Sequence, residues 1–177
     1  MNGNCHFIFG ASVGALSSVL LQTDATQTAL MVSTCLIGSI FPDIDNPNSN
    51  FGQLTKPVST IIGKIHKAEG KKAYQHRGIL HSLTLYSVGL ILSYLFFPYL
   101  LGFFVGALSH IFLDMFNPSG VPVFLFRRIR LARVPSSEVK VCTILTGLLT
   151  VFAIGMAIYC YNFGVYLDIQ SIKPIWL

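Results

Sequence analysis

Long apolar stretches alternate with short polar connections along the chain, and this alternation predicts membrane-spanning helices. A helix that crosses a bilayer needs about 20 mainly apolar residues. We predict five spans, at residues 7–22, 26–42, 78–97, 99–116 and 141–165. Three of them (7–22, 26–42 and 99–116) are short for a full crossing, which leaves helix tilt, local thinning of the bilayer or a re-entrant helix as alternatives.

Composition points the same way. The 177 residues are 53% hydrophobic and only 11% charged, with a mean hydropathy of +0.64. Soluble domains carry about 25% charged residues, so a water-soluble globule of this composition would lack polar surface. The sequence therefore predicts an all-α fold: a polytopic membrane helical bundle of about five transmembrane helices, forming one membrane-embedded domain over residues 1–177.

Small residues recur four positions apart within two of the predicted spans. Gly10 and Gly14 lie in the first span, and Gly102 and Gly106 lie in the fourth. Small residues at this spacing let helix backbones approach closely in lipid. We therefore expect close helix packing at both places.

The basic residues gather in two polar connections, and this sets the expected orientation. Eleven of the twelve lie in or beside these connections: Lys56, Lys64, Lys67, Lys71, Lys72, Arg77, Arg127, Arg128, Arg130, Arg133 and Lys140. Positively charged loops stay in the cytosol, so we expect a cytosolic N-terminus and, with five spans, an external C-terminus. The net charge of +5 then reflects topology, and we expect no nucleic-acid partner, because no aromatic residues interleave to stack on bases.

Residues 121–134 are apolar at first and then basic. This order is typical of a segment that lies on an anionic membrane surface. Membrane lipids are therefore expected partners of the chain.

The four cysteines, Cys5, Cys35, Cys142 and Cys160, are scattered singly. Without a CxxC pair, the sequence favours neither a thiolate zinc site nor a disulfide framework. We expect all four to be small buried apolar side chains.

Metal-ligand residues gather at one end of the predicted bundle. The topology brings four of the five histidines and three of the seven acids to the cytosolic face, although they are far apart in sequence: His6, Asp43, Asp45, His76, His81, His110 and Asp114. Ionisable residues at membrane depth are costly and usually functional. The sequence therefore predicts a site for a divalent metal at this face.

The spacing within the group supports a site, with a structural alternative for each part. His110 and Asp114 are four apart, so one helix face presents both; the alternative is a polar pair that packs helices together. Asp43 and Asp45 lie in a Pro-bounded turn, where both carboxylates can face one cation. The alternative is a solvated turn that ends a helix. His76 and His81 would lie about 140° apart on a helix, so both can face one site only if His76 lies in the preceding loop and folds back. The alternative is that one of them is a polar residue at a helix end.

Together these residues resemble a known family. The resemblance covers residues 6 to about 121 and rests on Cys5–His6 with Gly10, Pro42–Asp45, His76–Gly78, His81–Ser82 and a run from Gly106 to Pro118. It is to the YdjM family of bacterial inner-membrane proteins, described as metal-dependent hydrolases, some of them under SOS (LexA) control. One departure is Cys5, where the family often has Thr. The resemblance implies a multi-pass protein of the bacterial inner (cytoplasmic) membrane.

A more distant likeness concerns one helix. Gly106-x-x-x-His110-x-x-x-Asp114 looks like the metal-binding helix of zinc-dependent phospholipase C enzymes, which hydrolyse phosphoesters with several His and Asp ligands. It implies that the seven gathered residues are the ligand candidates.

The leading hypothesis is a metal-dependent hydrolase of a lipid or phosphoester at the cytosolic membrane face, with one or two ions of zinc or manganese. Asp43 or Asp45 would act as general base, and Arg77 would clamp a phosphate or merely anchor the loop. One alternative is a non-enzymatic protein that binds, senses or transports a metal ion. Another is a cluster that only holds short helices together.

Overall fold

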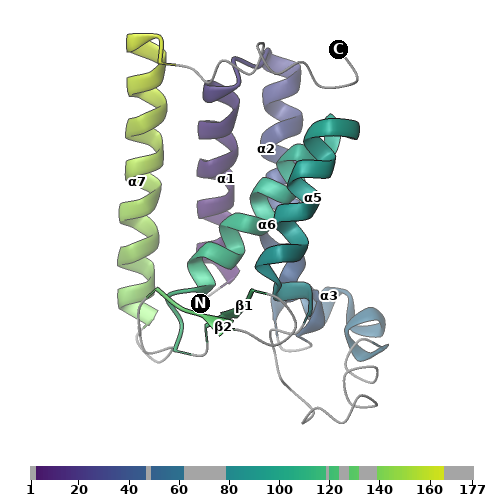
Figure 1. The fold of residues 1–177 in the computed structure, drawn as a ribbon. Coiled ribbons are helices and arrows are strands. Elements are labelled where there is room, and N and C mark those ends of the chain that lie inside the picture. Colours follow the sequence, from purple (N-terminus) through teal and green to yellow (C-terminus); the bar gives the residue numbers. More distant parts are fainter. Residues whose placement is uncertain are drawn as a thin grey trace.

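Five long helices form the described part of the chain, which in this computed structural model comprises residues 3–46, 49–61, 79–118, 120–123, 128–131 and 139–165. They are α1 (Gly3–Leu20), α2 (Ala25–Ile40), α5 (Leu83–Phe96), α6 (Leu101–Asp114) and α7 (Val139–Phe163). Each helix overlaps one of the five predicted spans, although α1 begins four residues before the first span and α7 two residues before the fifth. Figure 1 shows them packed side by side as a bundle, so the all-α prediction is confirmed.

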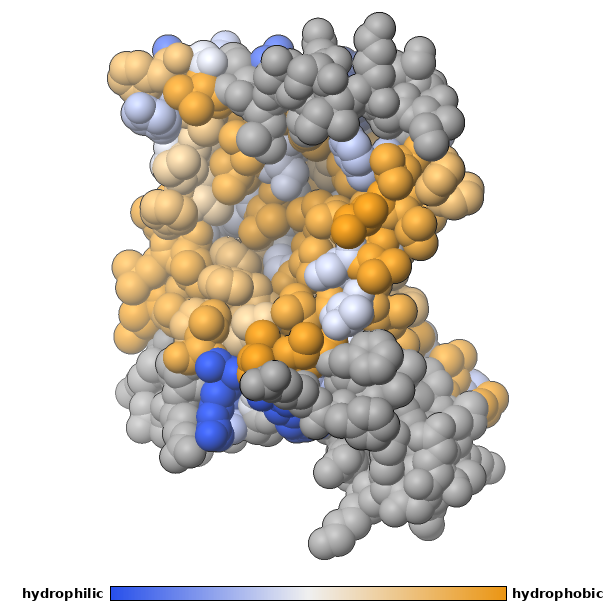
Figure 2. Space-filling model, viewed as in Figure 1, coloured by the Kyte–Doolittle hydropathy of each residue, from blue (hydrophilic) through white to orange (hydrophobic). Residues whose placement is uncertain are grey.

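Within the described residues, three segments are long and apolar enough to cross a membrane: Gly3–Leu20, Ala25–Asp45 and Thr143–Phe163. Two apolar helical segments, Leu83–Phe96 and Pro98–Asp114, are shorter. The face seen in Figure 2 is hydrophobic over most of the height of the bundle. On α7 the side chains of Leu148, Val151 and Phe152 are about two-thirds exposed, as expected for a helix that faces lipid.

Local chemistry explains where the helices begin and end. Asp24 caps α2: its side chain accepts from the Gln27 backbone N–H at 2.8 Å, and the Gln27 side chain accepts from the Asp24 backbone in return. Helix α5 begins at Leu83, five residues later than the predicted span, because Ile79–His81 forms a separate 3-10 turn, η2. Pro98 opens the short turn η3 (Pro98–Leu100), which separates α5 from α6.

Glycines allow α1 and α6 to pack closely against α2. A Cβ at Gly106 would overlap the Cys35 carbonyl oxygen, and one at Gly102 would lie 2.6 Å from the Met31 carbonyl oxygen. On α1, a Cβ at Gly14 would lie 3.0 Å from the Cys35 Cβ. Helix α2 is therefore the common neighbour of both Gly-x-x-x-Gly pairs, and the expected close packing is present.

Short elements close the lower end of the bundle in Figure 1. They are the 3-10 turn η1 (Phe41–Asp45), helix α3 (Asn50–Leu54), and strands β1 (Val121–Pro122) and β2 (Arg128–Ile129), which pair in antiparallel fashion. The Val123 carbonyl accepts hydrogen bonds from the Ser82 hydroxyl at 3.0 Å and from the Thr84 backbone N–H at 3.0 Å. These bonds tie the strand pair to the start of α5.

The expectation that residues 121–134 lie on the membrane surface was wrong for the apolar start of that segment. Val121 is fully buried in a core cluster with Tyr86, Ala107, Ile111 and Met115. Packing against α5 and α6 gives this side chain the apolar surroundings that we had assigned to lipid. The described basic part, residues 128–131, is exposed.

Candidate metal centre

Six of the seven predicted ligand residues come together at one end of the bundle. His6 lies on α1, Asp43 and Asp45 on η1, His81 on η2, and His110 and Asp114 on α6. These segments all reach the lower end of the bundle in Figure 1, as the alternating direction of the helices requires. The seventh, His76, and the neighbouring Arg77 lie outside the described residues.

Four side-chain atoms form a closed ring of alternating nitrogen and oxygen. The Nε2 atom of His81 lies 3.7 Å from Oδ1 of Asp43 and 3.8 Å from Oδ2 of Asp114. The Nε2 atom of His110 lies 3.8 Å from each of the same two oxygen atoms. Two histidine nitrogens and two carboxylate oxygens, contributed by η1, η2 and α6, thus each lie 3.7–3.8 Å from their two neighbours in the ring.

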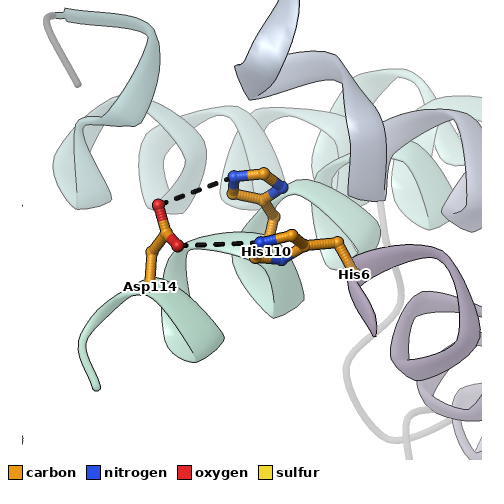
Figure 3. Close-up of side chains that lie close together, drawn as sticks. All are labelled: His6, His110 and Asp114. Atoms are coloured by element: carbon orange, nitrogen blue, oxygen red, sulfur yellow. Dashed lines mark ion pairs between the residues drawn. The ribbon is translucent and has the colours of Figure 1, made fainter. Parts of the chain in front are cut away.

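His6 joins this ring from the side. Its ring stacks on that of His110, with centroids 3.8 Å apart and planes inclined by 15°. Its Nε2 atom lies 3.6 Å from Oδ1 of Asp114. Figure 3 shows that the two carboxylate oxygens of Asp114 point to different histidines, Oδ1 to His6 and Oδ2 to His110.

Neighbouring groups hold the ring members in these orientations. Nδ1 of His110 lies 2.7 Å from the Ser39 carbonyl oxygen, to which it donates, so its other nitrogen faces the ring. Oδ2 of Asp45 lies 3.6 Å from Nδ1 of His81. The Asn117 side-chain amide donates to Oδ1 of Asp114 at 2.7 Å. Metal-binding histidines in proteins usually have their second nitrogen oriented in this way.

The site is almost closed to solvent. The side chains of His6, His81, His110 and Asp114 are at most 2% exposed, whereas that of Asp43 is 15% exposed. Burial by itself would lower the pKa of His81, which lies before the start of α5, but the carboxylates of Asp43 and Asp45 outweigh it and raise that pKa to about 9. The site therefore concentrates negative charge that favours a cation.

The donor set fits a divalent metal ion. Nε2 of His110 is buried and has no hydrogen-bond partner within the described part of the chain, which is costly unless another group satisfies it. Zinc bound at about 2.0–2.1 Å by four N and O atoms requires ligand atoms about 3.3 Å apart. The four edges of the ring, at 3.7–3.8 Å, are about half an ångström longer than that value.

The residues form two overlapping groups of three, His6–His110–Asp114 and Asp43–His81–His110, whose ligand atoms lie within 4.8 Å of one another. Both groups need His110. Because its Nδ1 is engaged by Ser39, Nε2 alone is directed at either group. His110 and Asp114 together with His6, or His110 and Asp43 together with His81, would hold an ion.

Comparison with known proteins adds the family. The model of the YdjM inner membrane protein family matches residues 1–170. The chain belongs to the YdjM family. It is 33% identical over 137 residues to the inner membrane protein YdjM of Escherichia coli (strain K12), and equally to that of Shigella flexneri. The match covers 70% of this chain and 64% of each relative.

No solved structure matches the chain. The family description and the apolar helices together make this a multi-pass protein of the bacterial inner membrane.

Two contributors to the site were missed by sequence reasoning. The Ser39 carbonyl is a backbone group and has no signature in the sequence. Asn117 follows Asp114 by three residues, a spacing that brings side chains together on a helical turn, so this residue could have been found. We had noted it only as part of the family motif.

Proposed function

We propose that this protein binds a divalent metal ion, zinc or manganese, at the ring and hydrolyses a lipid or phosphoester at the cytosolic face of the membrane. One observation carries the proposal: four side chains of metal-ligand type, from three separate elements, have ligand atoms 3.7–3.8 Å apart around a nearly closed site in a membrane protein. Burying several ionisable groups is expensive. A cation would offset that cost directly.

The ring residues would hold the ion: His81, His110, Asp43 and Asp114. His6 would orient Asp114 through Oδ1, the oxygen outside the ring, or would be a ligand of a second ion. Asp45, predicted from the sequence as a ligand or base, lies beside Nδ1 of His81, the nitrogen that points away from the other ring members. It is better suited to orient the imidazole of His81. A bound divalent cation supplies Lewis acidity, which activates water and polarises a carbonyl or phosphoryl oxygen.

Asp43 is the ring member best placed to handle a proton. Its side chain is the most exposed of the ring, at 15%, so water and substrate would approach beside it. A carboxylate that offers one oxygen to a cation retains a second oxygen, which can accept a proton from water. Arg77, which lies outside the described residues, would bind a phosphate group of the substrate; the sequence leaves anchoring of the loop as the alternative.

The second candidate function is metal binding without catalysis. It is favoured by the burial of the ring, because structural metal sites are closed while catalytic sites keep an open position. Transport would also need polar groups at the other end of the bundle. At that end, the bundle has a cavity of about 370 Å³ with mainly apolar walls, which argues against transport. The cavity is lined by Ser17, Leu20, Leu21, Leu90, Ile91, Tyr94, Leu95, Leu101 and Val105.

The deciding experiment has two stages. Elemental analysis of the purified protein, beside His110→Ala and Asp43→Ala, tests for the ion; stoichiometric metal in the wild type and its loss in both variants supports the site. Turnover of a panel of phospholipids and phosphoesters by the metal-loaded protein in liposomes then tests for hydrolysis. Stoichiometric metal without turnover would favour the second function, and no metal would reject both.

A further inference from the structure

A short amphipathic segment follows the last residues of α2 at the cytosolic end of the bundle. Helix α3 (Asn50–Leu54) is followed by helical residues 56–61. Three large apolar side chains of this segment are exposed: Leu54 at 81%, Val58 at 44% and Ile61 at 58%. Val58 and Ile61 are three apart on a helix and therefore share a face.

The segment is attached to the metal-binding turn η1. The Ser49 hydroxyl lies 2.8 Å from the Asp43 carbonyl oxygen and accepts from the Gly52 backbone N–H at 2.8 Å. Gly52 packs so closely on Asn46 that a Cβ would overlap the Asn46 carbonyl oxygen. The buried Ser59 hydroxyl donates to the Gly52 carbonyl at 3.2 Å. These contacts fix residues 49–61 against η1.

This attachment sets the depth of the segment. The membrane-crossing stretch of α2 ends at Asp45, and α3 begins five residues later. In Figure 1, α3 projects sideways from the lower end of the bundle. The segment is thus held beside the end of this membrane-crossing stretch, where a boundary between lipid and water is expected.

The positive charge around the segment indicates which partner its exposed apolar side chains contact. Residues 46–75 carry five lysines and a single acid, Glu69, and Lys56 is exposed within the helical part. The cytosolic leaflet is negatively charged and attracts such segments. Apolar side chains with adjacent lysines are the composition of helices that lie in a membrane interface.

We propose that residues 50–61 lie in the lipid surface of the inner leaflet, with Leu54, Val58 and Ile61 inserted among the lipids. The contact anchors η1, and so Asp43, at the membrane surface. If the cluster acts on a lipid, as proposed above, this contact presents the exposed side of the site to the headgroups. The insertion itself depends on neither metal nor substrate.

Tryptophan fluorescence in liposomes tests the insertion. In the full chain with Trp176→Phe, which removes the single native tryptophan, Val58→Trp places a probe on the apolar face. The matched control is Lys56→Trp, an exposed position two residues earlier on the same helix. Liposomes of phosphatidylethanolamine and phosphatidylglycerol with brominated acyl chains supply a quencher in the lipid, and iodide supplies one in the water.

We expect the V58W variant to emit at shorter wavelength than the K56W variant and to lose most of its emission to brominated lipid but little to iodide. The K56W variant should respond in the opposite way. Equal quenching of both variants by iodide would overturn the proposal. Protection of V58W from both quenchers would also overturn it, because the face would then be covered by protein. Neither result bears on metal binding, so this proposal can fail while the metal site stands.

Discussion

Nδ1 of His110 on α6 lies 2.7 Å from the carbonyl oxygen of Ser39 on α2. The contact joins a side chain to the backbone of a helix 71 residues earlier in the chain. It leaves Nε2 as the nitrogen that faces Asp43 and Asp114. The packing of α6 on α2 thereby decides which atom of His110 can bind a cation.

Replacing His110 should remove the metal. His110→Ala deletes one of two ring nitrogens, and we expect stoichiometric metal to fall to background in elemental analysis. Because the substitution also opens a buried cavity, the melting temperature should be measured in parallel. His66→Ala, at the one histidine that the sequence does not place in the gathered group, is the control and should retain its metal. Full metal content in a folded His110→Ala protein would disprove the ring as the site.

Asp45 should behave as an orienting residue and not as a ligand. Asp45→Asn keeps the size of the side chain but removes the charge beside Nδ1 of His81. Loss of such a partner typically weakens metal binding roughly 10–100-fold without abolishing it. A metal-competition titration against a chelator measures this. Asp43→Asn, which alters a ring oxygen, should cost more; if the two variants bind equally weakly, Asp45 is a ligand after all.

Asn117 should position Asp114. Its amide donates to Oδ1 of Asp114 at 2.7 Å, so Asn117→Ala frees that carboxylate to rotate. We expect metal affinity to fall by at least about tenfold, with little change in melting temperature in the absence of metal. Asn117→Ser, which retains a shorter donor, should recover part of the affinity. An unchanged affinity in Asn117→Ala would show that the bond has no part in binding.

Metal affinity should depend on pH in a defined direction. A metal binds imidazole only after its proton has left, and the pKa of His81 is raised to about 9 in the ion-free site. Below pH 9 one proton must therefore leave His81 for each ion bound there. The apparent affinity should fall by about tenfold for each pH unit of acidification. Titrations at pH 7 and pH 8 check this, and equal affinities would contradict it.

Replacing a glycine that packs against α2 should destabilise the protein. A Cβ at Gly106 would overlap the Cys35 carbonyl oxygen, whereas one at Gly155 on α7 would meet nothing within 4 Å. We expect Gly106→Ala to destabilise the protein by about 1–3 kcal/mol, the usual cost of overpacking. Gly155→Ala is the matched control and should leave the melting temperature in detergent unchanged. Equal melting temperatures would mean that α2 and α6 can move apart at no cost.

The sequence predicted the bundle because the membrane imposes simple rules. Five apolar stretches gave five helices, and alternation of their direction placed His6, His81 and Asp114 at one end before any contact was known. Helix starts were less predictable. The start of α5 depends on hydrogen bonds from Ser82 and Thr84 to the carbonyl of Val123, which is distant from both in the sequence. Val121 likewise packs in the protein core, whereas the sequence pattern had placed it in lipid.

By itself, the sequence determined that the chain is a helical membrane protein and which end of the bundle carries the histidines and aspartates, because hydropathy and the direction of each helix are properties of single segments. Only the tertiary structure decided that His81, His110, Asp43 and Asp114 form one ring while Asp45 stands behind His81. Those relations depend on how helices pack and rotate against one another. The spacing of the glycines predicted close packing, but it did not say that α2 is the helix on which both glycine pairs pack.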